Sequence, residues 1–159
     1  MVDFLSTEFG KIAATFLLSM MPIGELRIGL PYGIVAGLSL PVAAAASVIG
    51  NMVPVPFILL FITKIFAFMR KHMPKLDSFV SRLEHKAEKH RNKIEKWGYL
   101  GLFCLVGIPL PGTGAWTGGL VAALFELDFK KSVFVIFLGV ILAAVIMMVV
   151  TKLGIYAFF

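Results

Sequence analysis

The chain has 159 residues, of which 59% are hydrophobic and only 15% are charged, with a formal net charge of +6 and a mean hydropathy of +0.94. A soluble domain carries about a quarter charged residues, so this composition excludes an ordinary soluble protein and indicates a single integral membrane domain over residues 1–159. Between Arg70 and Lys96 nine Lys/Arg accompany four Asp/Glu, and positive charge confined to one loop indicates membrane topology rather than nucleic-acid binding.

The first part of the chain is predicted to form two short apolar arms around a break. The arms cover about residues 7–21 and 25–38, and Pro22 and Gly24 separate them. Each arm is shorter than the roughly twenty residues that span the hydrocarbon core. Such arms form either one kinked span or a re-entrant hairpin, and in both cases the non-helical backbone is tolerated only where protein or a cavity surrounds it.

A long apolar run over residues 41–69 follows, and it is long enough to span the membrane. Pro54 and Pro56 predict a kink midway along it, and Asn51 is expected to hydrogen-bond a neighbouring helix. Residues 71–97 differ in kind, because apolar residues recur there at helical spacing with charged residues between them. They predict an amphipathic helix that lies on the membrane surface or caps the bundle.

The second part of the chain repeats the order of the first. Two short arms over residues 98–110 and 113–125 flank a Pro/Gly-rich break, and a final span covers about residues 132–150. A shift of 87 residues places Pro109 on Pro22 and Ala123 on Ala36. We therefore expect repeat 1 over 7–70, an amphipathic connector over 71–97 and repeat 2 over 98–159.

The predicted fold is an all-α integral membrane protein: an inverted repeat of two re-entrant helical hairpins, each followed by a transmembrane helix. The positive-inside rule places residues 71–97 and the Lys130-Lys131 turn in the cytoplasm. The acidic N-terminus and the uncharged turn over residues 37–41 are then outside, as is the C-terminus. Arm length alone supports the re-entrant interpretation, since spanning arms would leave these charges on the same sides.

Two stretches carry the resemblance to a known family: Gly24-Glu25-Leu-Arg27-Ile-Gly-Leu-Pro31-Tyr-Gly33 and Pro109-Leu-Pro111-Gly-Thr-Gly-Ala-Trp-Thr-Gly118. With them the chain resembles the small multidrug export protein family, which is itself similar to the DedA/VTT group of membrane proteins. The resemblance implies opposed re-entrant hairpins, a homodimer in the cell (inner) membrane, and movement of a lipid carrier such as undecaprenyl phosphate, coupled to protons. Glu25 matches the acid of the first DedA motif. The arginine of the later motif has no counterpart between Gly107 and Gly119, and Arg27 is expected to serve instead.

Glu25 and Arg27 are the acid–base pair expected at membrane depth, where ionised groups are costly unless they are paired or functional. The second arm of each hairpin begins at its break, so its helix N-terminus favours an anion there. Thr113 is expected to cap the later arm, and protonation of Glu25 is expected to free Arg27 for a headgroup. The predicted substrate-binding residues are Arg27, Glu25, Gly112, Thr113, Gly114, Trp116, Thr117 and Tyr32, and the predicted breaks are Pro22, Gly24, Pro31, Pro109 and Pro111.

Three functions remain open at this point. The first is a transporter or flippase of a phosphate-bearing lipid, and the second is a proton-coupled exporter of lipophilic cations, with Glu25 as counter-ion and Trp116 and Tyr32 as aromatic partners. The third is a non-transporting structural membrane protein in which Glu25 and Arg27 form a fixed ion pair. No nucleophile–base pair, phosphate loop or metal-ligand spacing stands out, so an enzyme, a cofactor and a metal are not expected.

Overall fold

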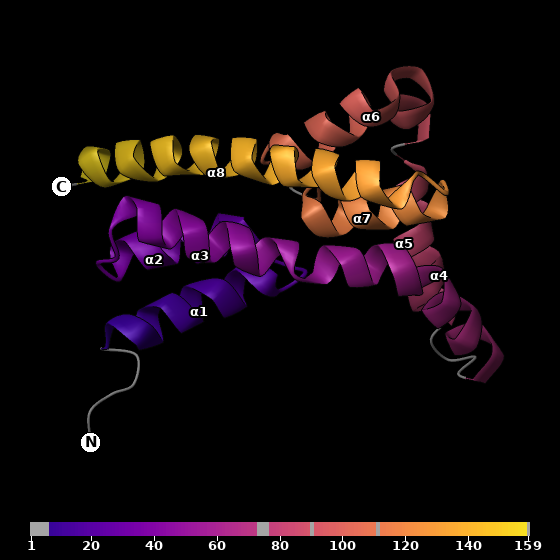
Figure 1. Cartoon of the computed structure of the whole chain (residues 1–159), viewed down its shortest axis with the longest axis horizontal. Helices are drawn as coiled ribbons and strands as arrows, with labels where there is room; N and C mark the ends of the chain where they lie inside the picture. The colour runs from indigo at the N-terminus through magenta and orange to yellow at the C-terminus, as the bar shows by residue number, and fades with distance from the viewer. Residues whose placement is uncertain (1–6, 73–76, 90, 111, 159) are drawn as a thin grey trace.

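The computed structural model describes residues 7–72, 77–89, 91–110 and 112–158. These residues form helices and connecting turns without a strand, as predicted (Figure 1). The helices, in chain order, are α1 (Glu8–Met20), α2 (Leu26–Val35), α3 (Leu40–Met52), α4 (Pro54–His72), α5 (Asp77–Glu88), α6 (Arg91–Gly107), α7 (Ala115–Leu124) and α8 (Phe129–Phe158).

Two segments are long and apolar enough to cross a membrane, Leu40–Phe68 and Phe129–Gly154. These candidate spans coincide with the two long apolar runs predicted from the sequence. The first consists of α3 and the start of α4, which are separate helices on either side of Val53. The interruption falls directly before Pro54, whose ring nitrogen cannot donate to the carbonyl four residues earlier.

The remaining apolar helices are short. Helices α2 and α7 have ten residues each, which corresponds to a length of about 15 Å, half of a hydrocarbon core of about 30 Å. Pro31 was expected to be a break but lies inside α2. Its missing N–H affects only the carbonyl of Arg27, and helices in a membrane protein tolerate such a loss where neighbouring groups surround the backbone.

The turn that links α2 to α3 recurs between α7 and α8. The Leu38 N–H donates to the Gly33 carbonyl at 3.0 Å, and 89 residues later the Leu127 N–H donates to the Ala122 carbonyl at 2.9 Å. The shift of 87 is therefore wrong beyond the breaks, and the predicted match of Ala36 with Ala123 is wrong with it. The reason is that seven residues separate α6 from α7 whereas five separate α1 from α2.

Helix contacts recur in the same register. A Cβ added at Gly50 in α3 would meet the carbonyl of Phe16 in α1, and one added at Gly139 in α8 would lie 3.2 Å from the carbonyl of Phe103 in α6. Phe16 and Phe103 are 87 residues apart, and Gly50 and Gly139 are 89 apart. Helix α1 thus packs on α3 as α6 packs on α8, with α1 to α3 near the end where α8 finishes and α6 and α7 near the end where it begins (Figure 1).

The connector differs from the single helix expected over residues 71–97. Helix α4 continues to His72, α5 is separate, and α6 starts at Arg91 with a kink at Gly98, where φ is 52°. Residues 73–76 and 90 lie outside the described part. Helix α5 packs against α4 and α7 and buries Val80 completely, so this part of the connector caps the bundle, one of the two arrangements that the sequence left open.

Candidate functional site

The two Pro/Gly-rich stretches contact each other and enclose a polar cavity of about 240 Å³. Since α2 and α7 both begin at these stretches, the cavity lies where their N-terminal ends meet. Its lining comes from both stretches and from the two residues before the first, and comprises Pro22, Ile23, Gly24, Glu25, Arg27, Gly112, Thr113 and Thr117.

The Glu25 carboxylate binds the N-terminus of α7. Its Oε2 accepts the N–H of Ala115 and its Oε1 accepts the N–H of Trp116, each at 3.0 Å. The first N–H groups of a helix have no partner within the helix, and the macrodipole gives that end partial positive charge. A buried carboxylate, here only 5% exposed, is therefore bound by two charge-assisted bonds to two residues that lie 90 and 91 positions away.

Glu25 occupies this position in a strained backbone conformation, with φ 54° and ψ −153° at the residue before α2. The residue before α7 also has positive φ, but there it is Gly114, with φ 128°. Glycine adopts positive φ at little cost, whereas strain at other residues costs about 1–3 kcal/mol and clusters at functional sites. Glycine would lower the backbone strain at this position, yet the sequence has a glutamate there. This indicates that the carboxylate has a role at the site.

Arg27 reaches across to the second stretch. Its half-buried guanidinium donates to the carbonyl of Leu110 through Nη1 and to Oγ1 of Thr113 through Nη2, the latter at 2.8 Å. The guanidinium is also attracted electrostatically by Glu25. Arginine has five N–H donors, and these bonds use two of them.

Trp116 makes the corresponding contact from the other side. Arg27 and Trp116 are each the second residue of their helix, 89 positions apart. The indole Nε1–H of Trp116 donates to the carbonyl of Met20 at 3.0 Å, as Arg27 donates to that of Leu110. Each second arm thus places a donor side chain on a backbone carbonyl of the other hairpin, and the sequence did not predict this reciprocal arrangement.

Thr113 does not cap α7 as expected, because α7 begins after Gly114 without a side-chain cap of its own. Its hydroxyl lies 2.9 Å from the Ile108 carbonyl and 2.8 Å from the Leu110 carbonyl, and it accepts from Arg27. The cap comes instead from Glu25, in the other half of the chain. No local motif could reveal a cap supplied from 90 residues away.

The other predicted site residues have different positions. Thr117 is buried and its hydroxyl donates to the Gly112 carbonyl at 3.1 Å. Gly114 packs directly on the Glu25 carboxylate, where a Cβ would clash. Tyr32 and Pro109 are not among the residues that line the polar cavity, and Pro111 lies outside the described residues. Among the described residues, no group of three His, Cys, Asp or Glu side chains could hold a metal ion.

Fold and site define a small helical membrane protein whose two broken-helix stretches meet at a polar cavity with one carboxylate and one guanidinium. Residues 25–146 match the family model described as "Putative small multi-drug export protein", and the chain belongs to this family. No curated protein and no solved structure matches it. The match begins at Glu25 and includes five of the eight residues that line the cavity, whereas Pro22, Ile23 and Gly24 precede it.

Proposed function

We propose that this protein is a transporter or flippase that binds the phosphate headgroup of an amphipathic lipid carrier in the cavity between the two stretches. The hydrogen bonds of Arg27 to Leu110 and Thr113 carry this proposal, because they hold a cation at the point where both hairpins meet. A guanidinium binds phosphate oxygens in a planar, bidentate manner.

The charge balance around the cavity favours an anion over a cation. Glu25 is the acid in the lining, and both of its oxygens already accept N–H groups of α7. Helix α2 has no side-chain cap, so its N-terminus adds partial positive charge beside Arg27. An anionic headgroup would accept hydrogen bonds from the N–H donors beside the cavity.

Glu25 is the group through which protons would act. The contacts modify the mechanism expected from the sequence, since the carboxylate holds α7 as well as attracting Arg27. Protonation would remove the charge that strengthens both N–H bonds and would loosen α7 at the cavity. Proton binding would therefore change how the two hairpins are held together.

The proposal extends to topology and assembly. The recurring turns, the recurring glycine contacts and the half-length arms support an inverted repeat of two re-entrant hairpins. Residues 71–97 would then be cytoplasmic and both termini outside, in the cell membrane. Two full spans offer little wall for a pathway, so we propose a homodimer. A relationship to the DedA/VTT proteins and a substrate resembling undecaprenyl phosphate belong to the same proposal.

The test is lipid translocation in proteoliposomes, with a fluorescent polyprenyl phosphate as substrate. Arg27→Gln is expected to lower the rate at least tenfold, whereas Arg82→Gln removes an exposed arginine of α5 and leaves the rate unchanged. Glu25→Gln is expected to abolish the pH dependence. A wild-type rate and wild-type pH dependence in the Glu25 variant would contradict its role.

A second candidate is the export of lipophilic cations, and it is consistent with a family description that names multi-drug export. The same vesicles test it through uptake of a cationic dye driven by a pH gradient. Dye uptake that requires Glu25 but not Arg27, without phosphate-lipid movement, would support cation export and overturn the phosphate proposal. Movement of neither molecule would leave a structural role.

A further inference from the structure

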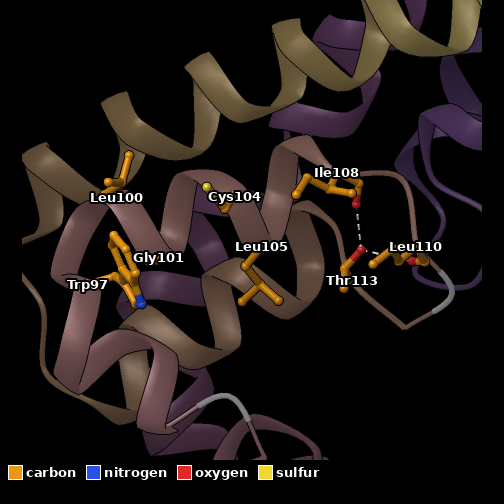
Figure 2. Close-up of a pocket in the computed structure, with 8 residues that line it drawn as sticks. All are labelled: Trp97, Leu100, Gly101, Cys104, Leu105, Ile108, Leu110 and Thr113. Atoms are coloured by element: carbon orange, nitrogen blue, oxygen red, sulfur yellow. Dashed lines mark hydrogen bonds between the residues drawn. The ribbon is translucent and has the colours of Figure 1, made fainter.

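A second cavity, of about 270 Å³, lies along α6 and is mainly apolar. Figure 2 shows its lining residues, most of which follow one side of the helix, with Leu110 and Thr113 at the far end. The lining consists of Trp97, Leu100, Gly101, Cys104, Leu105, Ile108, Leu110 and Thr113. We refer to it as the α6 groove. From Leu100 to Gly107, where α6 ends, there are eight residues of helix, or about 12 Å.

The α6 groove adjoins the polar cavity at its end residues. Thr113 lines both spaces, and its Oγ1 accepts the hydrogen bond from Arg27 Nη2. Leu110 lines the groove, and its carbonyl accepts from Arg27 Nη1. The residues that hold the guanidinium are thus the residues at which the apolar lining ends.

A polar space with a cation, next to an apolar groove, has the chemistry of a site for a molecule with an anionic head and a hydrocarbon chain. We propose that the α6 groove holds the hydrocarbon chain of an amphipathic phosphate whose headgroup lies at Arg27. This inference rests on the proposed function and adds the position of the hydrocarbon chain. It assigns to α6 a part in substrate binding, whereas Arg27 and Glu25 concern the headgroup alone.

The groove contributes position rather than affinity. Hydrocarbon in a bilayer is already in an apolar environment, so moving a chain from lipid into the groove releases little free energy. Its effect is to fix the direction in which the hydrocarbon chain leaves the headgroup site. A test must therefore measure the location of the hydrocarbon chain, and not only the strength of binding.

Cys104 provides a probe of this location. It is the only cysteine of the chain, it lines the groove and it is exposed. A matched control is Leu138→Cys in a Cys104→Ala background. Leu138 is exposed on α8 next to Gly139, which packs on Phe103, so the control cysteine lies close to the level of Cys104 without lining the groove.

The experiment uses the full chain in nanodiscs of zwitterionic lipid and two reagents with the same alkyl chain and a terminal maleimide. One reagent has a phosphate head and the other a trimethylammonium head. We expect the phosphate reagent to label Cys104 at least tenfold faster than the ammonium reagent, and the two to label the control cysteine at similar rates. Arg27→Gln and excess inorganic phosphate should each reduce the preference at Cys104 to about one.

Equal preferences at the two cysteines would overturn the proposal, as would a preference at Cys104 that survives Arg27→Gln. Calorimetry with inorganic phosphate and with ethyl phosphate reports on the headgroup site alone. If phosphate binds but Cys104 shows no preference for the phosphate reagent, the groove proposal is rejected and the proposed function stands. If phosphate does not bind, the groove proposal and the proposed function are both rejected. Efficient cross-linking of Cys104 to Cys104 by a short bis-maleimide would assign this face to a second copy of the chain and overturn the proposal.

A second variant, Gly101→Leu, tests the groove without touching the headgroup contacts. Gly101 lines the groove, and a leucine there would reduce the space available to a chain. Labelling of Cys104 by the phosphate reagent should fall about tenfold, while phosphate affinity stays unchanged. Unchanged labelling would contradict the proposal.

Discussion

The two halves of the molecule share a geometry but bury different chemistry. Four positions at which the first half buries a hydroxyl or an amide correspond to positions at which the second half buries an aliphatic side chain. Each of the eight side chains is at most 1% exposed. The correspondence is 87 residues on α1 and 89 on α3, and the pairs are Thr15 and Leu102, Ser19 and Val106, Ser47 and Ile136, and Asn51 and Val140.

The second half shows that these helix contacts do not require polar groups. Thr15 and Ser19 donate their hydroxyls to the preceding turn of α1, at 2.7 and 2.8 Å. The buried polar atoms of Ser47 and Asn51, however, have no hydrogen-bond partner in the described part of the chain. A buried polar group without a partner costs about 1–3 kcal/mol. Among the described residues, the first half carries this cost at Ser47 and Asn51 and the second half at Ser132. The first half is also the half that supplies Glu25 and Arg27, so we infer that its more polar interior serves transport rather than folding.

The largest expected effects come from the glycines that let the helices approach. Gly50→Ala would place a methyl group against the backbone carbonyl of Phe16, and we expect a loss of about 3 kcal/mol in unfolding free energy. Gly139→Ala would meet mainly the side chain of Val106, with its Cβ at 2.8 Å, which can adjust in part. We expect a loss of about 1–2 kcal/mol there.

Gly154 is the control, because nothing lies within 4 Å of an added Cβ. Gly154→Ala should be neutral or stabilise by up to about 1 kcal/mol through helix propensity. Unfolding by SDS in mixed micelles measures all three variants. Equal losses at Gly50 and Gly154 would mean that α1 and α3 are not in close contact.

The next effect concerns the cap that joins the halves. In Glu25→Gln one carboxylate oxygen becomes an amide NH₂, which cannot accept from α7, and the remaining bond loses its charge. We expect a loss of about 2 kcal/mol. Glu8→Gln, on the exposed first turn of α1, should change the unfolding free energy by less than about 0.5 kcal/mol. Similar values for the two variants would contradict the capping role.

Much of this arrangement follows from sequence patterns. Apolar runs and Pro/Gly breaks predicted the order of short arms and spans, and the predicted end of the connector at residue 97 falls next to the kink at Gly98. The shift of 89 residues beyond the breaks could not be predicted from the sequence, because two extra residues in a break do not change the hydrophobic pattern. The Glu25 cap did not follow either, because it depends on how two breaks meet in space. Pro31 was wrongly predicted to be a break, because a proline in the sequence does not reveal whether neighbouring helices surround the backbone next to it.

Exchanging the residues at one pair of equivalent positions tests the comparison directly. Val140→Asn should lower the unfolding free energy by about 2 kcal/mol, because it buries an amide in an aliphatic site. Asn51→Val should be neutral or stabilising by about 1 kcal/mol, since it removes two unpartnered groups. If Asn51→Val instead costs 2 kcal/mol or more, Asn51 has a partner such as a buried water in the native protein.

Asn51→Val also separates folding from function. If the polar interior serves transport, this variant should fold at least as well as the native protein and translocate lipid more slowly, by about threefold or more in the proteoliposome assay. Val140→Asn should leave the rate per folded molecule unchanged. A fully active Asn51→Val protein would contradict the inferred role of the polar interior.

The smallest expected effect concerns Trp116, the counterpart of Arg27. Trp116→Phe keeps an aromatic ring and removes the N–H that donates to the Met20 carbonyl, so we expect a loss of about 1 kcal/mol. Tyr32→Phe is the control, because it removes a hydroxyl from a half-buried ring outside the cavity lining. Since Trp116 contributes an uncharged donor, its loss should leave phosphate affinity within about twofold, whereas Arg27→Gln should abolish binding. Equal losses of phosphate affinity in the two variants would mean that the contact between the hairpins, and not the charge of Arg27, creates the site.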